Sequence, residues 1–139
     1  MNTISKAELS FYQKTGELFY AVAAADKIVR TQEFDTLKEV VNTLWRPMEH
    51  YEDEFGEDAA YQMEIVFDWL DYESLDAEDC FDDFKDFYHN HPSLFSEKRK
   101  QLILKTAHKI AASFSGKNKS ELTLLGKIQL LFFPENEIT

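Results

Sequence analysis

Asp26 and Glu33 lie seven residues apart in the segment ADKIVRTQE, at a spacing that could bring their side chains into one site. If Asp26 ends one helix and Glu33 lies in the first turn of the next, a tight loop would place both carboxylates in one oxygen-rich pocket. Hard divalent cations such as Ca²⁺ prefer oxygen ligands of this kind. The spacing therefore predicts Asp26 and Glu33 as candidate ligands of a divalent metal ion.

A purely structural role would explain the same two residues. A glutamate in the first turn of a helix complements the positive end of the helix dipole, and an aspartate in a loop can turn the chain. The twelve-residue calcium loop of an EF-hand, with alternating carboxylates and an inner glycine, does not occur around Asp26. Metal binding and helix-end capping therefore both stay open from the spacing alone.

The histidines offer a weaker metal-binding pattern. His89 and His91 form an H-x-H, but side chains two apart on a helix point in different directions, so joint ligation would need an extended chain before Pro92. The alternative is a histidine that interacts favourably with a helix C-terminus. An E-x-x-H pair is absent, which disfavours a di-iron carboxylate bundle. His108 is expected to be partly buried and hydrogen-bonded.

No pattern predicts a catalytic centre. The sequence has no H-E-x-x-H motif, no glycine-rich phosphate loop and no serine or cysteine nucleophile arrangement. Cys80 is the only cysteine, which excludes an internal disulfide and a cysteine zinc site and favours a small buried hydrophobic residue. We assign no catalytic residue, and a metal-dependent hydrolase is the one enzyme hypothesis that we retain.

The elements that would position these residues are predicted to be helices. Helix starts are expected at side chains that can accept hydrogen bonds from the first backbone amides, namely Ser5, Thr31, Asp76, Ser96 and Ser120. Ser5 and Glu8 have the spacing of a capping box. Helix ends are expected near Pro47, Pro92, Gly116 and Pro134. The apolar spacing from Ala59 to Leu70 predicts a further helix.

The apolar positions follow the helical period, and no region alternates with period two. We therefore predict an all-α fold, a compact bundle of about six helices that forms a single domain over residues 1–139. The helix after Ser5 is expected to be central, and Gly16 would allow a neighbouring helix to approach closely. The residues expected in one shared core are Phe19, Val22, Leu37, Val41, Phe67, Phe84, Ile110 and Ile128.

The first and last parts of the chain repeat one arrangement. In both, a long helix ending in small residues is followed by a five-residue step to the next cap, from Asp26 to Thr31 and from Ser115 to Ser120. The sequence therefore predicts two helical hairpins related by a rough two-fold axis, with acidic helices between them.

The first loop resembles the tellurite-resistance TerB-like family, whose hairpin loops tend to read A-D-G-x-[IV]-x-x-x-E. Ala25, Asp26, Val29 and Glu33 match this pattern, and Lys27 replaces the usual glycine. The resemblance implies a bundle with paired helical hairpins and an association with tellurite and chemical stress. It also implies a divalent-metal surface and no enzyme activity.

The second loop departs further from the family pattern. Ser115 replaces the aspartate, Gly116 is kept, and the glutamate position falls on Leu122, with Glu121 one residue early. By this alignment, half of a paired acidic site is missing.

The charge distribution suggests a different function. The chain has a net charge of −11, and residues Glu49–Asp86 contain sixteen acidic residues and one lysine. Residues Glu97–Lys127 instead carry a local charge of +6. The alternative hypothesis is thus an acidic interaction module, of an inhibitor or immunity-like kind, that docks on a basic partner protein. Two solvated faces that attract one another within the monomer would explain the same asymmetry.

Composition limits the partners and the location. The acidic excess argues against DNA or RNA as a ligand, because binding to phosphates needs clustered positive charge. No stretch approaches the roughly 20 apolar residues of a membrane span, and the N-terminus lacks the layout of a signal peptide. We therefore expect a cytoplasmic protein whose partner is another protein.

Overall fold

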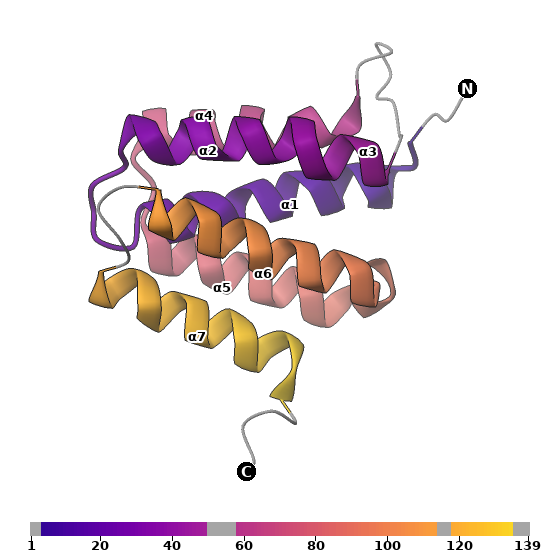
Figure 1. The fold of residues 1–139 in the computed structure, drawn as a ribbon. Helices are drawn as coiled ribbons and strands as arrows, with labels where there is room; N and C mark the ends of the chain where they lie inside the picture. The colour runs from indigo at the N-terminus through magenta and orange to yellow at the C-terminus, as the bar shows by residue number, and fades with distance from the viewer. Residues whose placement is uncertain (1–3, 50–57, 114–117, 135–139) are drawn as a thin grey trace.

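The computed structural model describes residues 4–49, 58–113 and 118–134, and these ranges contain six long helices and no strand. The long helices are α1 (Lys6–Ala23), α2 (Thr31–Val40), α4 (Gln62–Glu73), α5 (Ala77–Asn90), α6 (Glu97–Ala112) and α7 (Lys119–Phe132). A π-helical turn, Val41–Trp45, joins α2 to the short helix α3 (Arg46–Met48). Short 3₁₀ turns at Ala59–Tyr61 and Pro92–Leu94 precede α4 and α6. The predicted all-α bundle is confirmed (Figure 1).

Helix α1 lies at the centre of the bundle, as predicted, because it contacts α4, α5, α6 and α7. Its closest approach to α4 depends on Gly16. A Cβ atom added at Gly16 would lie 2.6 Å from the carbonyl oxygen of Met63, which is closer than real Cβ contacts. The predicted role of Gly16 in close helix packing is confirmed.

The buried apolar residues form one continuous cluster, and all eight predicted core residues belong to it. Trp45 is fully buried within this cluster, between the rings of Phe11, Tyr12 and Phe19. Its indole Nε1 donates to Thr106 Oγ1 at 3.1 Å, so the one polar atom of its ring is satisfied. Burial of this shared core is the main driving force for assembly of the helices.

Three of the five predicted caps are confirmed by hydrogen bonds. Ser5, Asp76 and Ser96 each accept a bond from a backbone amide of the first turn. The caps predicted at Thr31 and Ser120 are wrong. Arg30 and Asn118 have the extended backbone of an N-cap, and Thr31 and Ser120 already lie inside their helices.

Two of the four predicted helix ends are confirmed. Helix α5 ends at Asn90 before Pro92, and α7 ends at Phe132 before Pro134, as expected. Pro47 does not stop the helix before it, because it lies in the first turn of α3, where a missing amide proton costs little. The end predicted near Gly116 lies outside the described residues.

The N-terminal ends of α2 and α7 lie at the same end of the bundle, next to the loop between α1 and α2 (Figure 1). Helix α2 packs on α6 and α4, whereas α7 packs on α6 and α1. No helix in the described ranges is long and apolar enough to cross a membrane.

Candidate functional site

The loop between α1 and α2 is held in shape by Asp26. Its Oδ1 accepts a hydrogen bond from the backbone amide of Ile28 at 3.1 Å, a local turn typical of aspartate. Lys27, between them, has a φ of 70°, which is the left-handed conformation that glycine adopts most easily. The replacement of glycine by Lys27 therefore leaves the backbone in the shape that favours glycine.

Asp26 also joins this loop to the start of α7. Its Oδ2 accepts bonds from Arg30 Nη1 at 3.0 Å and from Asn118 Nδ2 at 2.6 Å. Asn118 is 92 residues away in the sequence and caps α7. The carboxylate of Asp26 thus links the loop of the first predicted hairpin to the start of α7, which belongs to the second predicted hairpin.

Glu33 and Glu121 have the same place in their helices. Each is the third helical residue, and each carboxylate accepts a bond from the backbone amide of its own N-cap residue. The distances are 2.7 Å from Arg30 N to Glu33 Oε1 and 3.1 Å from Asn118 N to Glu121 Oε1. Both side chains are therefore tied to the first turn of their own helices.

The alignment that placed Leu122 opposite Glu33 is wrong. Glu121 is the structural equivalent of Glu33, and Leu122 is exposed to solvent. The spacing of Asn118 and Glu121 fits a capping box, so the sequence contained the signal for Glu121. Ser115 and Gly116, the other matched positions, lie outside the described residues.

The carboxyl groups of Glu33 and Glu121 are buried against each other. Glu33 is 1% exposed and Glu121 is 2% exposed. The pKa of Glu33 is raised to about 8, mainly by burial and also by hydrogen bonding to the carboxyl of Glu121, against the lowering effect of the Arg30 amide. Glu121 Oε2 has no hydrogen-bond donor among the described groups, except that a protonated Glu33 could donate to it. Glu33 therefore keeps its proton at neutral pH and can donate it to Glu121 Oε2.

These residues fit a metal ion only in part. The orphaned Glu121 Oε2 and the carboxyl of Glu33 offer two oxygen ligands in a buried position. Asp26, the other predicted ligand, already accepts bonds from Arg30 and Asn118. No group of three or more metal-binding side chains occurs in the described ranges. The residues suit a weak site completed by water or backbone oxygens.

The histidines do not form a joint site. His89 lies in the last turn of α5 and His91 caps that helix, and both are exposed to solvent. The ring of His91 lies 4.5 Å from the ring of Phe87. His108 is exposed on α6, which corrects the prediction that it is partly buried. Cys80 is buried, as predicted.

The side chain of Arg99 lies in a buried ionic cluster that was not predicted from the sequence. Arg99 Nε and Nη2 donate to the two carboxylate oxygens of Glu49 at 2.8 and 2.9 Å, and Nη2 also donates to Glu8 at 2.6 Å. The phenol of Tyr12 donates to Glu49 as well. Glu8 therefore does not complete the capping box predicted with Ser5. Arg99 belongs to the basic segment and Glu49 to the acidic segment, and the two side chains form an ion pair within the protein.

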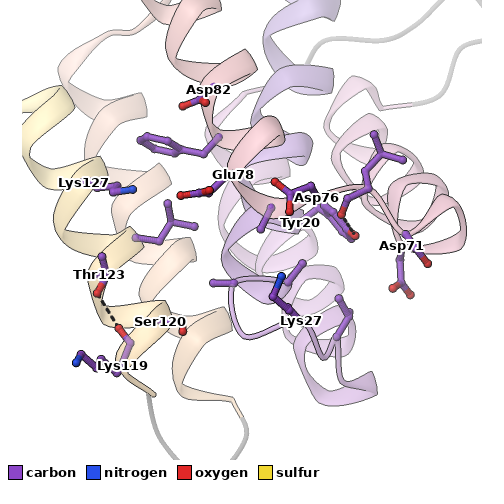
Figure 2. A pocket seen from close by; sticks show the side chains of 18 residues that line it. Tyr20, Lys27, Asp71, Asp76, Glu78, Asp82, Lys119, Ser120, Thr123 and Lys127 are labelled. Atoms are coloured by element: carbon purple, nitrogen blue, oxygen red, sulfur yellow. Dashed lines mark hydrogen bonds between the residues drawn. The ribbon is translucent and has the colours of Figure 1, made fainter.

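A pocket of about 660 Å³ lies between the α1–α2 loop, the start of α5 and helix α7 (Figure 2). Phe81 and Leu124 contribute an apolar surface. The charged lining consists of Asp71, Asp76, Glu78 and Asp82 together with Lys27, Lys119 and Lys127. Its size is in the range of small-molecule sites, and its lining of both signs suits a dipolar group rather than a simple ion.

Comparison with family models, curated proteins and solved structures finds no match to this chain. The TerB-like resemblance therefore stays a prediction that rests on the first loop.

Proposed function

We propose that this protein is a non-enzymatic binding domain, resembling TerB-like accessory and stress-response domains, that takes up a divalent cation between Glu33 and Glu121, beside Asp26. The observation that carries the proposal is the burial of two facing carboxyl groups at the starts of α2 and α7. The left-handed backbone of Lys27 adds support, because the family pattern has glycine at that position.

The chemistry of the pair explains why a cation would bind. Burial of Glu33, together with its contact with the Glu121 carboxyl, raises the pKa of Glu33, so an ionised Glu33 needs a compensating charge. A divalent cation supplies that charge in place of the Glu33 proton. Binding then releases the proton, so the affinity should increase with pH.

Arg30 limits the affinity. Its guanidinium holds Asp26 Oδ2, so a cation that also uses Asp26 must displace a positively charged neighbour. The positive ends of the α2 and α7 dipoles oppose a cation as well. We therefore expect weak binding, at millimolar rather than nanomolar concentrations.

Thermal unfolding at pH 8 with and without millimolar Ca²⁺, Mg²⁺, Mn²⁺ or Zn²⁺ tests the proposal. At least one cation should raise the unfolding midpoint of the wild type, because a ligand bound only by the native state stabilises it by mass action. Glu33→Gln and Glu121→Gln should each remove this shift, because the amide keeps the shape but not the charge. The Asp26→Asn/Glu33→Gln double variant should also lose it.

The exposed carboxylate of Glu78 provides the control, and Glu78→Gln should keep the full shift. The proposal is rejected if no cation moves the wild-type midpoint, or if the Glu33 and Glu121 variants respond as the wild type does.

A further inference from the structure

Helix α4 has two apolar faces, and only one of them is covered. Met63, Phe67 and Leu70 are buried against the rest of the bundle. Ile65, Trp69 and Tyr72 have the same spacing on the opposite side and form a second stripe. Their side chains are 57%, 58% and 82% exposed. The outer face of α4 thus presents three large apolar residues to solvent, where a surface helix normally carries polar ones.

On helix α4 itself, only negative charges flank the exposed stripe, whereas two basic residues, Lys38 and Arg46, act on Glu64 from neighbouring elements. Helix α4 contains four acidic residues and no lysine or arginine. At 100° per residue, Asp68 and Glu73 lie on the two sides of the stripe. In the described part of the chain, neither carboxylate forms an ion pair. An apolar centre with an acidic rim therefore lies on the outer face of α4.

We propose that this face of α4 is a docking surface for a basic segment of another protein, which inserts an apolar side chain beside Trp69 and Tyr72. Tryptophan and tyrosine are enriched among the residues that dominate binding energy at interfaces. The acidic rim complements lysine and arginine, and it also repels the anionic headgroups of a membrane surface. The proposal is independent of the cation at Glu33 and Glu121.

A second copy of this chain fits the surface less well. Helix α4 carries no lysine or arginine, so a copy would have to dock on α4 through a different surface from the one it offers. Such head-to-tail contacts form open chains of molecules unless the rotation happens to close a ring. We therefore assign the surface to a different protein.

The surface continues towards the pocket of Figure 2. Leu75 follows the end of α4 and is 40% exposed, and it lines the pocket together with Asp71 and Asp76 (Figure 2). A segment that covers Tyr72 can therefore extend over Leu75 and place a basic group beside the acidic side of the pocket. This gives the partner segment a direction along α4.

Selection from a random twelve-residue peptide library on the immobilised full chain tests the proposal. The recovered peptides should combine lysine or arginine with a large apolar residue. Trp69→Ala and Tyr72→Ala should each weaken a recovered peptide at least about tenfold. Asp68→Lys should weaken it too, and high salt should reduce the binding. Burial of Trp69 should shift its fluorescence to shorter wavelength.

Leu130→Ala on α7 and Asp79→Lys on α5 are matched controls, because they change an exposed apolar and an exposed acidic residue elsewhere. Both should bind as the wild type does, and circular dichroism should show that every variant folds. Peptides without basic residues, or equal effects of the α4 and control variants, would overturn the proposal. Self-association of the wild type that Tyr72→Ala abolishes would assign the surface to a second copy and would also overturn it.

Discussion

Glu17 on α1 is a partly buried carboxyl group with the carboxyl of Asp83 beside it. The pKa of Glu17 is raised to about 7, mainly by burial and also by the neighbouring Asp83, whereas Lys14 lowers it. The pKa of Asp83 is lowered, mainly because it accepts a hydrogen bond from Glu17. Glu17 therefore keeps its proton at mildly acidic pH and donates it to an ionised Asp83, which also pairs with Lys14.

This arrangement predicts a loss of stability as the pH rises. The folded pKa lies above the unfolded value, so the contribution is complete below about pH 4.5 and is lost as the pH rises through about 7. Glu17→Gln should remove this dependence, because its amide donates to Asp83 at every pH. Urea unfolding at pH 5 and pH 8 should show the variant gaining roughly 1–3 kcal/mol on the wild type over this interval. An unchanged difference between the two proteins would contradict the prediction.

Individual residues of the site also show which features can be predicted from the sequence and which depend on the folded structure. Asp26 and Glu33 could be singled out because their types and spacing are local. Their contacts with Asn118 and Glu121 could not be predicted, since the capping-box spacing of those two residues indicates a helix start but not its position beside α2. Arg99 shows the same limit, because its bonds to Glu8 and Glu49 join residues 91 and 50 apart.

At the scale of whole helices, two glycines give opposite predictions for one substitution. Gly16→Ala should destabilise the protein by roughly 1–3 kcal/mol, because the new methyl group meets the backbone of α4 at Met63. Gly126→Ala should stabilise it by roughly 0.5–1 kcal/mol, because a Cβ at that point of α7 meets no atom and the loss of glycine lowers the entropy of the unfolded chain. Chemical denaturation of both variants gives the two signs. Equal effects would show that the contact between α1 and α4 is looser than described.

The helices themselves were largely predictable because apolar spacing and caps are local features. Ser5, Asp76 and Ser96 cap their helices as expected. Thr31 and Ser120 do not, because the extended backbone that defines a cap occurs one or two residues earlier. The π-helical turn at Val41–Trp45 was not predicted, since its apolar residues also fit a regular helix.

At the scale of the molecule, attraction between the acidic and basic segments within the monomer explains only part of the asymmetric charge. Arg99 and Glu49, from the basic and acidic segments, pair inside the protein. The outer face of α4 keeps its acidic residues around exposed apolar ones. Among the described residues, the internal attraction that the sequence allowed therefore explains the pair of Arg99 and Glu49, and it does not explain the acidic residues on the outer face of α4.

The continuous core predicts that the whole bundle unfolds in one step. Phe84 on α5 and Ile110 on α6 are fully buried in the same cluster as Trp45. Truncation of either residue to alanine should cost roughly 2–5 kcal/mol, as large-to-small changes in cores do. The two costs should lower the unfolding midpoint of every helix together, because the truncated side chains share neighbours with the rest of the core.

Two probes can follow this transition separately. In a Trp69→Phe background, fluorescence reports on Trp45 alone, at the junction of α2 and α3, whereas circular dichroism reports on all helices. Coincident transitions in the wild type, Phe84→Ala and Ile110→Ala would indicate two-state unfolding of one cooperative domain. If the Trp45 transition instead separates from the helical one in either variant, the paired ends of α2 and α7 join two units of different stability. In that case, Asp26 and Asn118 would lie at the boundary between those units.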